Sequence, residues 1–296
     1  GDFHLTDGAC AKLAVTYRDP GLSRVRRFPQ TTGSAVIKHI GIYLDVETTG
    51  LNSDTDKVIE LAMIPFEYSD SGKIYRVLPD YTSYQDPGIP LPEITTEITG
   101  ITDDMVAGHA IDLAEVEKLL STASIVIAHN ARFDRGFMEN FYDGFKDIAW
   151  GCSLNDINWN EEGTNVRTLE YLAYLYGFFY DAHRATIDCQ AGIEILSKNL
   201  PKSGTPVLKQ LLDAAMQTNY RLWAVKSPFD KKDVLKQRGY RWSSGNGNEP
   251  KSWYIDVDES KLDDELAFLR DEILMQSVET LPRKIINSKT RYSNRV

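Results

Sequence analysis

The sequence predicts an α/β domain followed by a small α+β domain. Three strand candidates come first, helix and strand candidates then alternate to about residue 200, and a compact segment with its own strands and helices begins near residue 221. A chain of 296 residues has room for one large domain and one smaller one. We therefore expect an N-terminal extension at 1–34, the α/β domain at 35–200, a helical connector at 201–220, a basic and aromatic α+β module at 221–280 and a basic tail at 281–296.

Two kinds of pattern predict the elements of the α/β domain. Apolar, β-branched runs bounded by turn residues predict strands, and the first three follow one another as a meander. Later strands alternate with helical patterns, one of which is closed by Gly177. The expected strands are 35–47, 58–68, 73–85, 124–128 and 148–153, and the expected helices are 113–121, 132–140, 168–176 and a last one from after His183 to about Lys198.

The C-terminal module has its own short elements. Residues 221–225 predict a strand, and a short helix is expected to end at Gly239. The run at 243–250, rich in Ser, Gly and Asn, predicts a hairpin turn before a strand at 252–258. A last helix is expected to start at Ser260. These elements predict an α+β unit.

Cysteine content and hydropathy narrow the class of protein. The cysteines Cys10, Cys152 and Cys189 are odd in number and lack CxxC spacing, which argues against a disulfide framework and a structural zinc site. No run approaches the roughly 18 apolar residues of a membrane span, and the first residues lack the apolar core of a signal peptide. We therefore expect a cytoplasmic protein with no membrane partner.

The net charge of −10 is unevenly distributed along the chain. Residues 38–200 carry −16, whereas 1–37 carry +2 and 201–296 carry +4. An acidic domain repels nucleic acid unless bound cations neutralise it locally, and basic flanks attract polyanions. Most of the carboxylates are expected to be solvated surface groups, so the question is which of them converge.

Four carboxylates occupy positions where α/β sheets form sites. Asp45 and Glu47 lie two residues apart near the carboxyl end of the first strand, so both side chains leave the same face. Asp134 lies in the first turn of the helix that follows a buried strand, and Asp188 lies near the start of the last helix, preceded by His183. Taken singly, each position has an ordinary explanation, such as an exposed strand end or a helix cap.

Together, the four carboxylates predict a metal site. Crowded in one cleft they would repel one another, and hard divalent cations with oxygen ligands relieve that repulsion. Oxygen-only ligation favours Mg²⁺ or Mn²⁺ over zinc, and two ions about 3.5–4 Å apart can stabilise both the attacking and the leaving oxygen of a phosphodiester displacement. His183 would then be the general base that takes a proton from the attacking water.

Three motifs contain these residues: Asp45-x-Glu47-x-x-Gly50, His129-Asn130-Ala131-x-Phe133-Asp134 and His183-x-Ala185-x-x-Asp188. In order and spacing they resemble the motifs of the DEDDh (DnaQ-like) 3′→5′ exonucleases, over about residues 40–200. The resemblance implies an RNase H-like mixed β-sheet flanked by helices and a site with two Mg²⁺, for which Mn²⁺ can substitute. It also implies that Asp45 bridges both ions, that Glu47 and Asp188 complete one site and Asp134 the other, and that His183 is the base.

The resemblance further implies substrate contacts around the first two motifs. The candidates are Thr48, Thr49, Leu51, Ile98, Thr99, Asn130 and Phe133. Leu51 and Ile98 are the expected wedge against the terminal base, with ordinary core packing as the alternative. Many relatives have His at the position of Thr99, and Asn130 and Phe133 either contact nucleic acid or shape the second motif.

Basic and aromatic residues are interleaved in the C-terminal module. Residues 221–256 hold eight basic, four acidic and six aromatic residues. Such a surface suits single strands, although a unit this small also needs aromatic residues for its core. We expect the module to position the strand or to recruit a partner, so that deleting 221–296 weakens binding to long single strands but spares hydrolysis of very short substrates.

The leading interpretation is a metal-dependent 3′→5′ exonuclease that releases nucleoside 5′-monophosphates from single-stranded DNA 3′ ends, in repair or proofreading. An exoribonuclease or oligoribonuclease would use the same residues, because rejection of the 2′-hydroxyl depends on pocket shape. A polymerase complex is a possible partner, although the sequence shows no convincing clamp- or polymerase-binding peptide. The alternative of another class, an inactive nucleic-acid-binding module or polymerase-associated accessory subunit, predicts loss of a metal ligand or of the base, yet all five residues are present.

Overall fold

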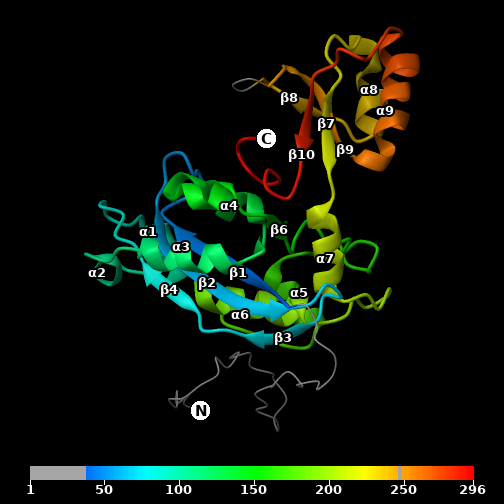
Figure 1. Cartoon of the computed structure of the whole chain (residues 1–296). Coiled ribbons are helices and arrows are strands. Elements are labelled where there is room, and N and C mark those ends of the chain that lie inside the picture. The colour runs from blue at the N-terminus through cyan, green and yellow to red at the C-terminus, as the bar shows by residue number, and fades with distance from the viewer. Residues whose placement is uncertain (1–37, 246–248) are drawn as a thin grey trace. The chain divides into compact units, whose positions relative to one another are not determined.

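The computed structural model describes residues 38–245 and 249–296, which form two compact units (Figure 1). Of the described residues, the first unit holds those up to Ala215 together with Tyr292–Arg295, and the second holds Met216–Arg291 with Val296. The N-terminal extension expected at 1–34 lies outside the described residues. No helix in the described ranges has the length and apolar composition needed to cross a membrane.

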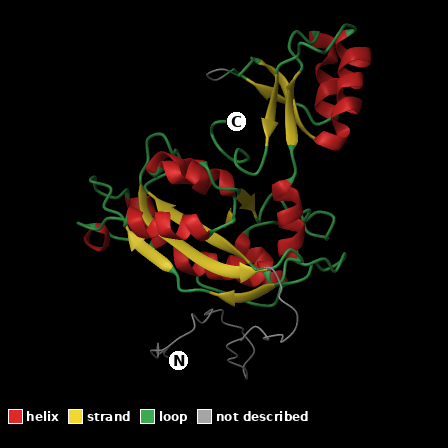
Figure 2. Cartoon of the chain, in the orientation of Figure 1, coloured by secondary structure: helices red, strands yellow, loops and turns green. Residues whose placement is uncertain are grey.

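The first unit is built on a mixed β-sheet with helices on both faces (Figure 2). Its strands run in the order β3–β2–β1–β5–β6, and β4 also pairs with β2. The central strand β1 is antiparallel to β2 and parallel to β5, which is in turn parallel to β6. The strands are β1 (His39–Thr48), β2 (Val58–Tyr68), β3 (Ile74–Val77), β4 (Tyr81–Tyr84), β5 (Ile125–Ala128) and β6 (Trp150–Cys152).

Alternating side chains along the strands divide the core in two. Ile42 and Leu44 of β1 belong to a cluster on the face covered by α3 (Leu113–Thr122) and α4 (Ala131–Phe141). Tyr43, between them in sequence, belongs to the cluster on the opposite face. That face is covered by α5 (Leu169–Leu175), α6 (Ala185–Leu196) and α7 (Val207–Met216). Because helices cover both faces, the central strands are apolar without alternation.

The strand expected at 73–85 is wrong, because the structure has two strands there, β3 and β4. Between them, Leu78–Asp80 have no strand structure, and Pro79 in that gap has no N–H to donate to a neighbouring strand. Both strands pair with β2, with Val77 opposite Phe66 and Tyr81 opposite Met63. The single strand β2 therefore pairs with both β3 and β4 and spans the gap between them.

Three helices differ from the expectation. Helices α1 (Glu93–Thr99) and α2 (Asp103–Val106) follow the proline-rich loop, where no helix is expected from sequence. Helix α7 lies within the expected connector at 201–220, but its apolar residues Leu208, Leu211 and Ala215 are fully buried in the core of the first unit. The helix therefore belongs to that unit.

The second unit is a four-stranded antiparallel sheet with helices packed against it. The strand order is β10–β7–β9–β8, with β7 (Asn219–Trp223), β8 (Arg241–Ser243), β9 (Ser252–Asp258) and β10 (Arg283–Ile286). The helices are α8 (Lys232–Gln237) and α9 (Leu262–Phe268), the second continued by a π-helical turn at Leu269–Leu274. Leu222, Leu235, Tyr240 and Leu269 are among the residues of its core. The unit is the small α+β domain expected from sequence.

Residues 281–296 do not behave as the basic tail that we expected from their charge. Arg283–Ile286 form β10, and Tyr292–Arg295, here called the return segment, belongs to the first unit. Within that unit, the Ser293 hydroxyl donates a hydrogen bond to Glu139 Oε2 at 2.6 Å, and Arg295 Nη2 donates one to Glu139 Oε1 at 2.9 Å. A buried acid on α4 therefore orders a segment that composition alone marks as a tail.

Candidate active site

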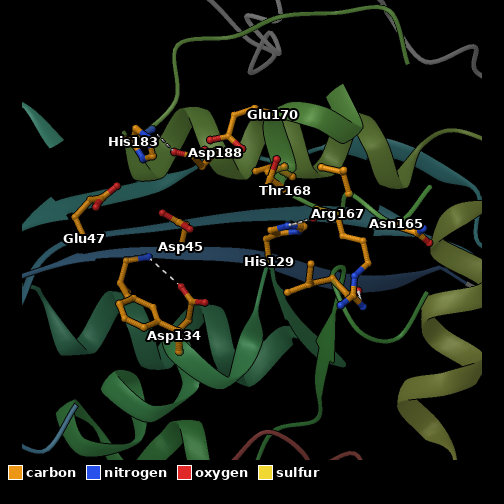
Figure 3. Close-up of a pocket in the computed structure, with 15 residues that line it drawn as sticks. Asp45, Glu47, His129, Asp134, Asn165, Arg167, Thr168, Glu170, His183 and Asp188 are labelled. Atoms are coloured by element: carbon orange, nitrogen blue, oxygen red, sulfur yellow. Dashed lines mark hydrogen bonds between the residues drawn. The ribbon is translucent and has the colours of Figure 1, made fainter. Parts of the chain in front are cut away.

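Three carboxylates meet near the carboxyl end of β1 (Figure 3). Asp45 and Glu47 of β1 and Asp188 of α6 offer carboxylate oxygens that all lie within 4.8 Å of one another. Asp188 reaches the strand because it lies in the first turn of α6, which packs against β1 and β2. Asp134, in the first turn of α4, lines the same cleft, and its Oδ1 accepts a hydrogen bond from the Val46 N–H at 3.3 Å.

Burial and mutual repulsion make this cluster costly to ionise. Burial raises the pKa of Asp45 well above its usual range, and the neighbouring Asp134 and Asp188 raise it further. Burial, followed by repulsion from Asp188, raises the pKa of Glu47 to about 7. Burial is also the largest cause of the raised pKa values of Asp134 and Asp188. A cluster of oxygen donors with this excess of negative charge fits a hard divalent cation, of the Mg²⁺ or Mn²⁺ kind.

An ion pair between a buried acid and a partly exposed arginine, missed in the sequence analysis, supports the cluster from β2. Glu60 lies opposite Glu47 in the β1–β2 pairing and is 1% exposed. It accepts hydrogen bonds from Arg184 Nη2 and from the Ala185 N–H, both at 3.3 Å. Arg184 also donates to Tyr84 Oη at 2.8 Å. The pair ties β2 to the start of α6, and an acid between apolar neighbours near the start of β2 was the sequence signal for it.

His183 is held at the mouth of the cleft by its backbone (Figure 3). The residue has a left-handed conformation with φ 68°, which is uncommon for residues other than glycine. Its backbone N–H and that of Arg184 both donate to Asp188 Oδ2, at 2.9 and 3.1 Å. The imidazole is exposed and lines the cleft, so it is accessible to water next to the carboxylates.

The expected substrate contacts separate into exposed and buried residues. Leu51 is 87% exposed and Ile98 is 53% exposed, so neither is the core residue that the alternative interpretation required. Thr48, Thr49 and Thr99 are buried, and none of them is among the described residues that line the cleft. Their hydroxyls are used in local hydrogen bonds, for example from Thr48 Oγ1 to Gly50 O and from Thr99 Oγ1 to Thr95 O. These threonines shape the turn that carries Leu51 and the end of α1 that carries Ile98.

The two candidates of the second motif have different surroundings. Asn130 is exposed at the start of α4 with φ 65°, a left-handed conformation that Asn tolerates well. Phe133 lines the cleft, and its ring lies 5.0 Å from that of Phe137 in the core behind it. Phe133 therefore forms part of the cleft wall, while Asn130 shapes the entry into α4.

The other end of the cleft contains residues that the sequence analysis did not single out as site residues. They are His129, Asn165, Arg167, Thr168 and Glu170 (Figure 3). The whole cleft has a volume of about 700 Å³, which is within the usual range of pockets for small ligands. Most of these residues lie on the loop before α5, which has no recognisable motif of its own. His129 begins the second motif, whereas the other four residues are recognised only by their position in the folded chain.

His129 has a structural role in this part of the cleft. Burial lowers the pKa of His129 to about 4, so the ring is neutral near pH 7. Its Nε2–H donates to Arg167 O at 2.9 Å, so Nδ1 accepts from the Ser153 hydroxyl, also at 2.9 Å. The ring therefore fixes the backbone of Arg167. The guanidinium of Arg167 reaches Leu154 O only at 3.5 Å, so within the described part of the chain its positive charge lines the cleft without a strong hydrogen-bond partner.

Comparison with known proteins places the chain in a family. A sequence model of the exonuclease family (RNase_T) matches residues 42–196, more than half of the chain. The chain therefore belongs to this exonuclease family. The match extends from β1 to the end of α6 and so includes all four carboxylates and His183. The expected family and the expected RNase H-like mixed sheet flanked by helices are both confirmed.

The curated relatives are much longer proteins. A PolC-type DNA polymerase III of Halalkalibacterium halodurans is 28% identical over 213 residues, which are 70% of this chain and 13% of that protein. A PolC-type DNA polymerase III of Staphylococcus aureus is 32% identical over 171 residues, 53% of this chain and 11% of that protein. The chain thus spans little more than a tenth of the length of these relatives.

Among solved structures, E. coli Exonuclease I in complex with a dT13 oligonucleotide is similar in fold. The two chains are 18% identical, and the TM-score is 0.50 over 74% of this chain and 63% of that chain. At this level of identity the likeness supports the fold. The chemistry of the site depends on the residues of the cleft.

Proposed function

We propose that the first unit is a metal-dependent 3′→5′ DNA exonuclease that releases nucleoside 5′-monophosphates. The observation that carries this proposal is the meeting of Asp45, Glu47 and Asp188 within 4.8 Å, beside Asp134 and His183, in a chain of the exonuclease family. The order of the motifs supports the 3′→5′ direction. The similarity to PolC-type DNA polymerases favours DNA over RNA as the substrate.

Each side chain of the cluster has a role in the proposed hydrolysis. Asp45 would be shared by two Mg²⁺ ions, with Glu47 and Asp188 completing one site and Asp134 the other. When bound, the ions would polarise the scissile phosphate and lower the pKa of the attacking water. His183 takes the proton from that water at one imidazole nitrogen, and its exposure lets it pass the proton to solvent.

Two apolar side chains and one cation support the substrate in this proposal. In this proposal Leu51 and Ile98 contact the terminal base, since both are apolar and exposed to solvent. Arg167 contributes a positive charge to the cleft, and a guanidinium with no strong partner in the cleft can bind a phosphate oxygen. The strand would therefore be held on both sides of the scissile bond.

The test is digestion of matched DNA and RNA oligomers, labelled at the 5′ end, with Mg²⁺ or EDTA. We expect Mg²⁺-dependent shortening of DNA from its 3′ end, with nucleoside 5′-monophosphates as products and slower loss of RNA. Asp45→Asn should abolish hydrolysis, and His183→Ala should lower kcat about 10²- to 10⁴-fold because it removes the base. Asp143→Asn, an exposed acid outside the cleft, is the matched control. Full activity of Asp45→Asn in Mg²⁺ would refute the proposed site.

The relation to PolC-type polymerases favours a second, related role in proofreading. In that case the chain would remove mismatched primer ends in a complex with a polymerase. Co-purification with a DNA polymerase, together with faster removal of a mismatched than a matched 3′ nucleotide in the complex, would support it. Equal rates on the two ends, with no polymerase recovered, would leave the chain as an independent exonuclease.

A further inference from the structure

In the second unit, aromatic rings and lysines follow one another along α8 and the neighbouring strands β8 and β9. The Lys232 Nζ lies 4.3 Å from the centre of the Phe229 ring, and Lys236 Nζ lies 6.0 Å from the Trp253 ring. Trp253 meets Trp242 edge to face, with ring centres 5.5 Å apart. Lys232 and Lys236 are one turn apart on α8, so the Phe229–Lys232 contact lies next to the contacts of Lys236, Trp253 and Trp242. We call these five residues the aromatic–lysine row.

Two rings of this row are exposed, although a small unit needs aromatic residues for its core. Phe229 is 81% exposed and Trp242 is 52% exposed. By contrast, Tyr240 is buried in the core of the unit, and Trp223 is also buried. The structure thus separates the aromatic residues of the module into buried rings and rings that face solvent. Large exposed rings grouped with charges mark a binding surface more often than a packing surface.

The row carries positive charges that are available to bind an anion. Residues 226–241 contain six basic and two acidic residues, whereas residues 256–272 contain two basic and eight acidic ones. Arg238 and Arg241 pair with Glu265 and Asp256. Among the described residues, neither Lys232 nor Lys236 has an acidic partner, so their ammonium groups can bind an anion.

We propose that the aromatic–lysine row binds single-stranded DNA, the substrate class of the proposed function on which this inference rests. Bases stack on Phe229 and Trp242, and phosphates bind Lys232 and Lys236 between them. The combination of rings with cations matches the repeating bases and phosphates of a single strand. An acidic peptide would need only the lysines.

A second binding surface on the same chain would act through effective concentration. A strand held by the second unit keeps its 3′ end near the first unit, and the covalent connection makes the second encounter intramolecular. The row should therefore lower KM for long single strands and leave kcat unchanged. The effect requires no contact between the two units.

The direct test is the affinity of the full chain for a fluorescent dT20, measured by anisotropy in EDTA so that no hydrolysis occurs. Phe229→Ala and Trp242→Ala should each raise Kd about 5- to 150-fold, the range that corresponds to loss of one stacked base. The double variant Lys232→Gln/Lys236→Gln should lower the slope of log Kd against log salt by about 1.4, or 0.7 for each phosphate contact.

The matched controls lie elsewhere in the second unit. Met275→Ala removes an exposed apolar side chain, and Lys261→Gln removes an exposed cation that lies beside Asp258. We expect both controls to bind dT20 like the wild type. Since Phe229 and Trp242 are exposed, their alanine variants should also keep the wild-type Tm. Wild-type affinity of the Phe229→Ala and Trp242→Ala variants would overturn the proposal.

Three further measurements decide between DNA, other ligands and failure of the proposed function. If rU20 binds more tightly than dT20, and the Phe229→Ala and Trp242→Ala variants lose that binding, DNA is not the ligand. DNA is also excluded if poly-glutamate displaces dT20 in a way that depends on Phe229 and Trp242. Hydrolysis of p-nitrophenyl thymidine 5′-monophosphate by the wild-type chain measures the active site alone. If that hydrolysis is absent while dT20 binding shows the expected losses, the proposed function fails and the row stands.

Discussion

The carboxylate of Glu47 illustrates a conflict between folding and function in single residues of the cleft. Burial and repulsion from Asp188 raise its pKa from 4.5 to about 7 in the folded chain. A carboxyl group with a raised pKa contributes most to stability below its unfolded pKa, and that contribution is lost as pH rises through its folded pKa. Without a cation, the ionised cluster therefore destabilises the first unit above about pH 7.

We predict that Glu47→Gln stabilises the cation-free first unit at pH 8. The gain should be about 1–3 kcal/mol, because the variant removes one of several buried like charges, and it should vanish near pH 4, where Glu47 is protonated in both states. Thermal unfolding in EDTA between pH 4 and pH 8 measures it. Adding Mg²⁺ should raise the Tm of the wild type more than that of the variant. Glu97→Gln, on exposed α1, is the control, and a Glu47→Gln variant less stable than wild type at pH 8 would contradict the prediction.

Local sequence predicts the four carboxylates of the cleft better than the residues that support them. Asp45 and Glu47 share a face because side chains alternate along a strand, and Asp134 lies in the first turn of a helix after a strand. The pairing of Glu47 with Glu60 depends instead on the register between β1 and β2. That register shifts between Glu47 and Thr48. No local pattern specifies that register shift. For the same reason, Arg167 could be placed in the cleft only once the loop before α5 was folded.

At the scale of elements, the close approach of α6 to β1 positions Asp188. Gly192 of α6 lies so close to Tyr43 of β1 that an added Cβ would be 2.0 Å from Tyr43 Cζ. Tyr43 is itself held by a 2.8 Å hydrogen bond with Ser153 Oγ, so it has little freedom to move. A larger residue at Gly192 would therefore push the helix, and Asp188 with it, away from the strand.

Gly192→Ala should destabilise the first unit by about 1–3 kcal/mol, since overpacking outweighs the helix propensity gained from alanine. It should also lower exonuclease activity by displacing Asp188 from Asp45. Urea unfolding and the rate of DNA hydrolysis measure the two effects. Gln190→Ala, on the same helix, is the control and should be within about 0.5 kcal/mol of wild type. If the Gly192→Ala variant is more stable than the wild type and fully active, the space between α6 and Tyr43 accommodates a methyl group and the prediction is wrong.

The elements differ in how well local sequence predicts them. The expected strand 58–68 has the bounds of β2, because its residues are mostly apolar and both of its faces are buried. Helix α1 was not expected, because its sequence EITTEIT is rich in β-branched residues, which are poor helix formers. Its contacts decide the outcome, among them a hydrogen bond from Thr95 Oγ1 to Thr49 O at 3.2 Å. Such tertiary contacts are not visible in local sequence.

At the scale of the whole molecule, the return segment makes residues near position 293 part of the first unit. Glu139 is 5% exposed and accepts hydrogen bonds from Arg135, Ser293 and Arg295. These hydrogen bonds hold the pKa of Glu139 below its usual range, although burial alone would raise it. Arg135 and Glu139 belong to α4, the helix that carries Asp134. The segment therefore supports the helix that carries Asp134 to the cleft.

We predict that the double variant Ser293→Ala/Arg295→Ala destabilises the first unit by about 1–3 kcal/mol, because the buried carboxylate of Glu139 loses two donors. The loss should appear in the unfolding of the first unit, followed through the near-UV signal of its buried tryptophans. Arg283→Ala, which removes an exposed cation of β10, is the control. If the first unit of the double variant has the same free energy of unfolding as in the wild type, the return segment contributes nothing to its stability.

The hydrogen bonds of Arg291 within the second unit affect the chain entropy of the first unit. Arg291 Nη2 donates to Gln217 O at 2.8 Å and to Asn219 Oδ1 at 2.9 Å, so the two ends of the second unit are held together. If that unit unfolds, about 75 residues separate α7 from the return segment, and closing such a flexible loop costs about 4 kcal/mol. Folding of the second unit removes most of that cost. Chain connectivity alone thus links the melting of one unit to that of the other.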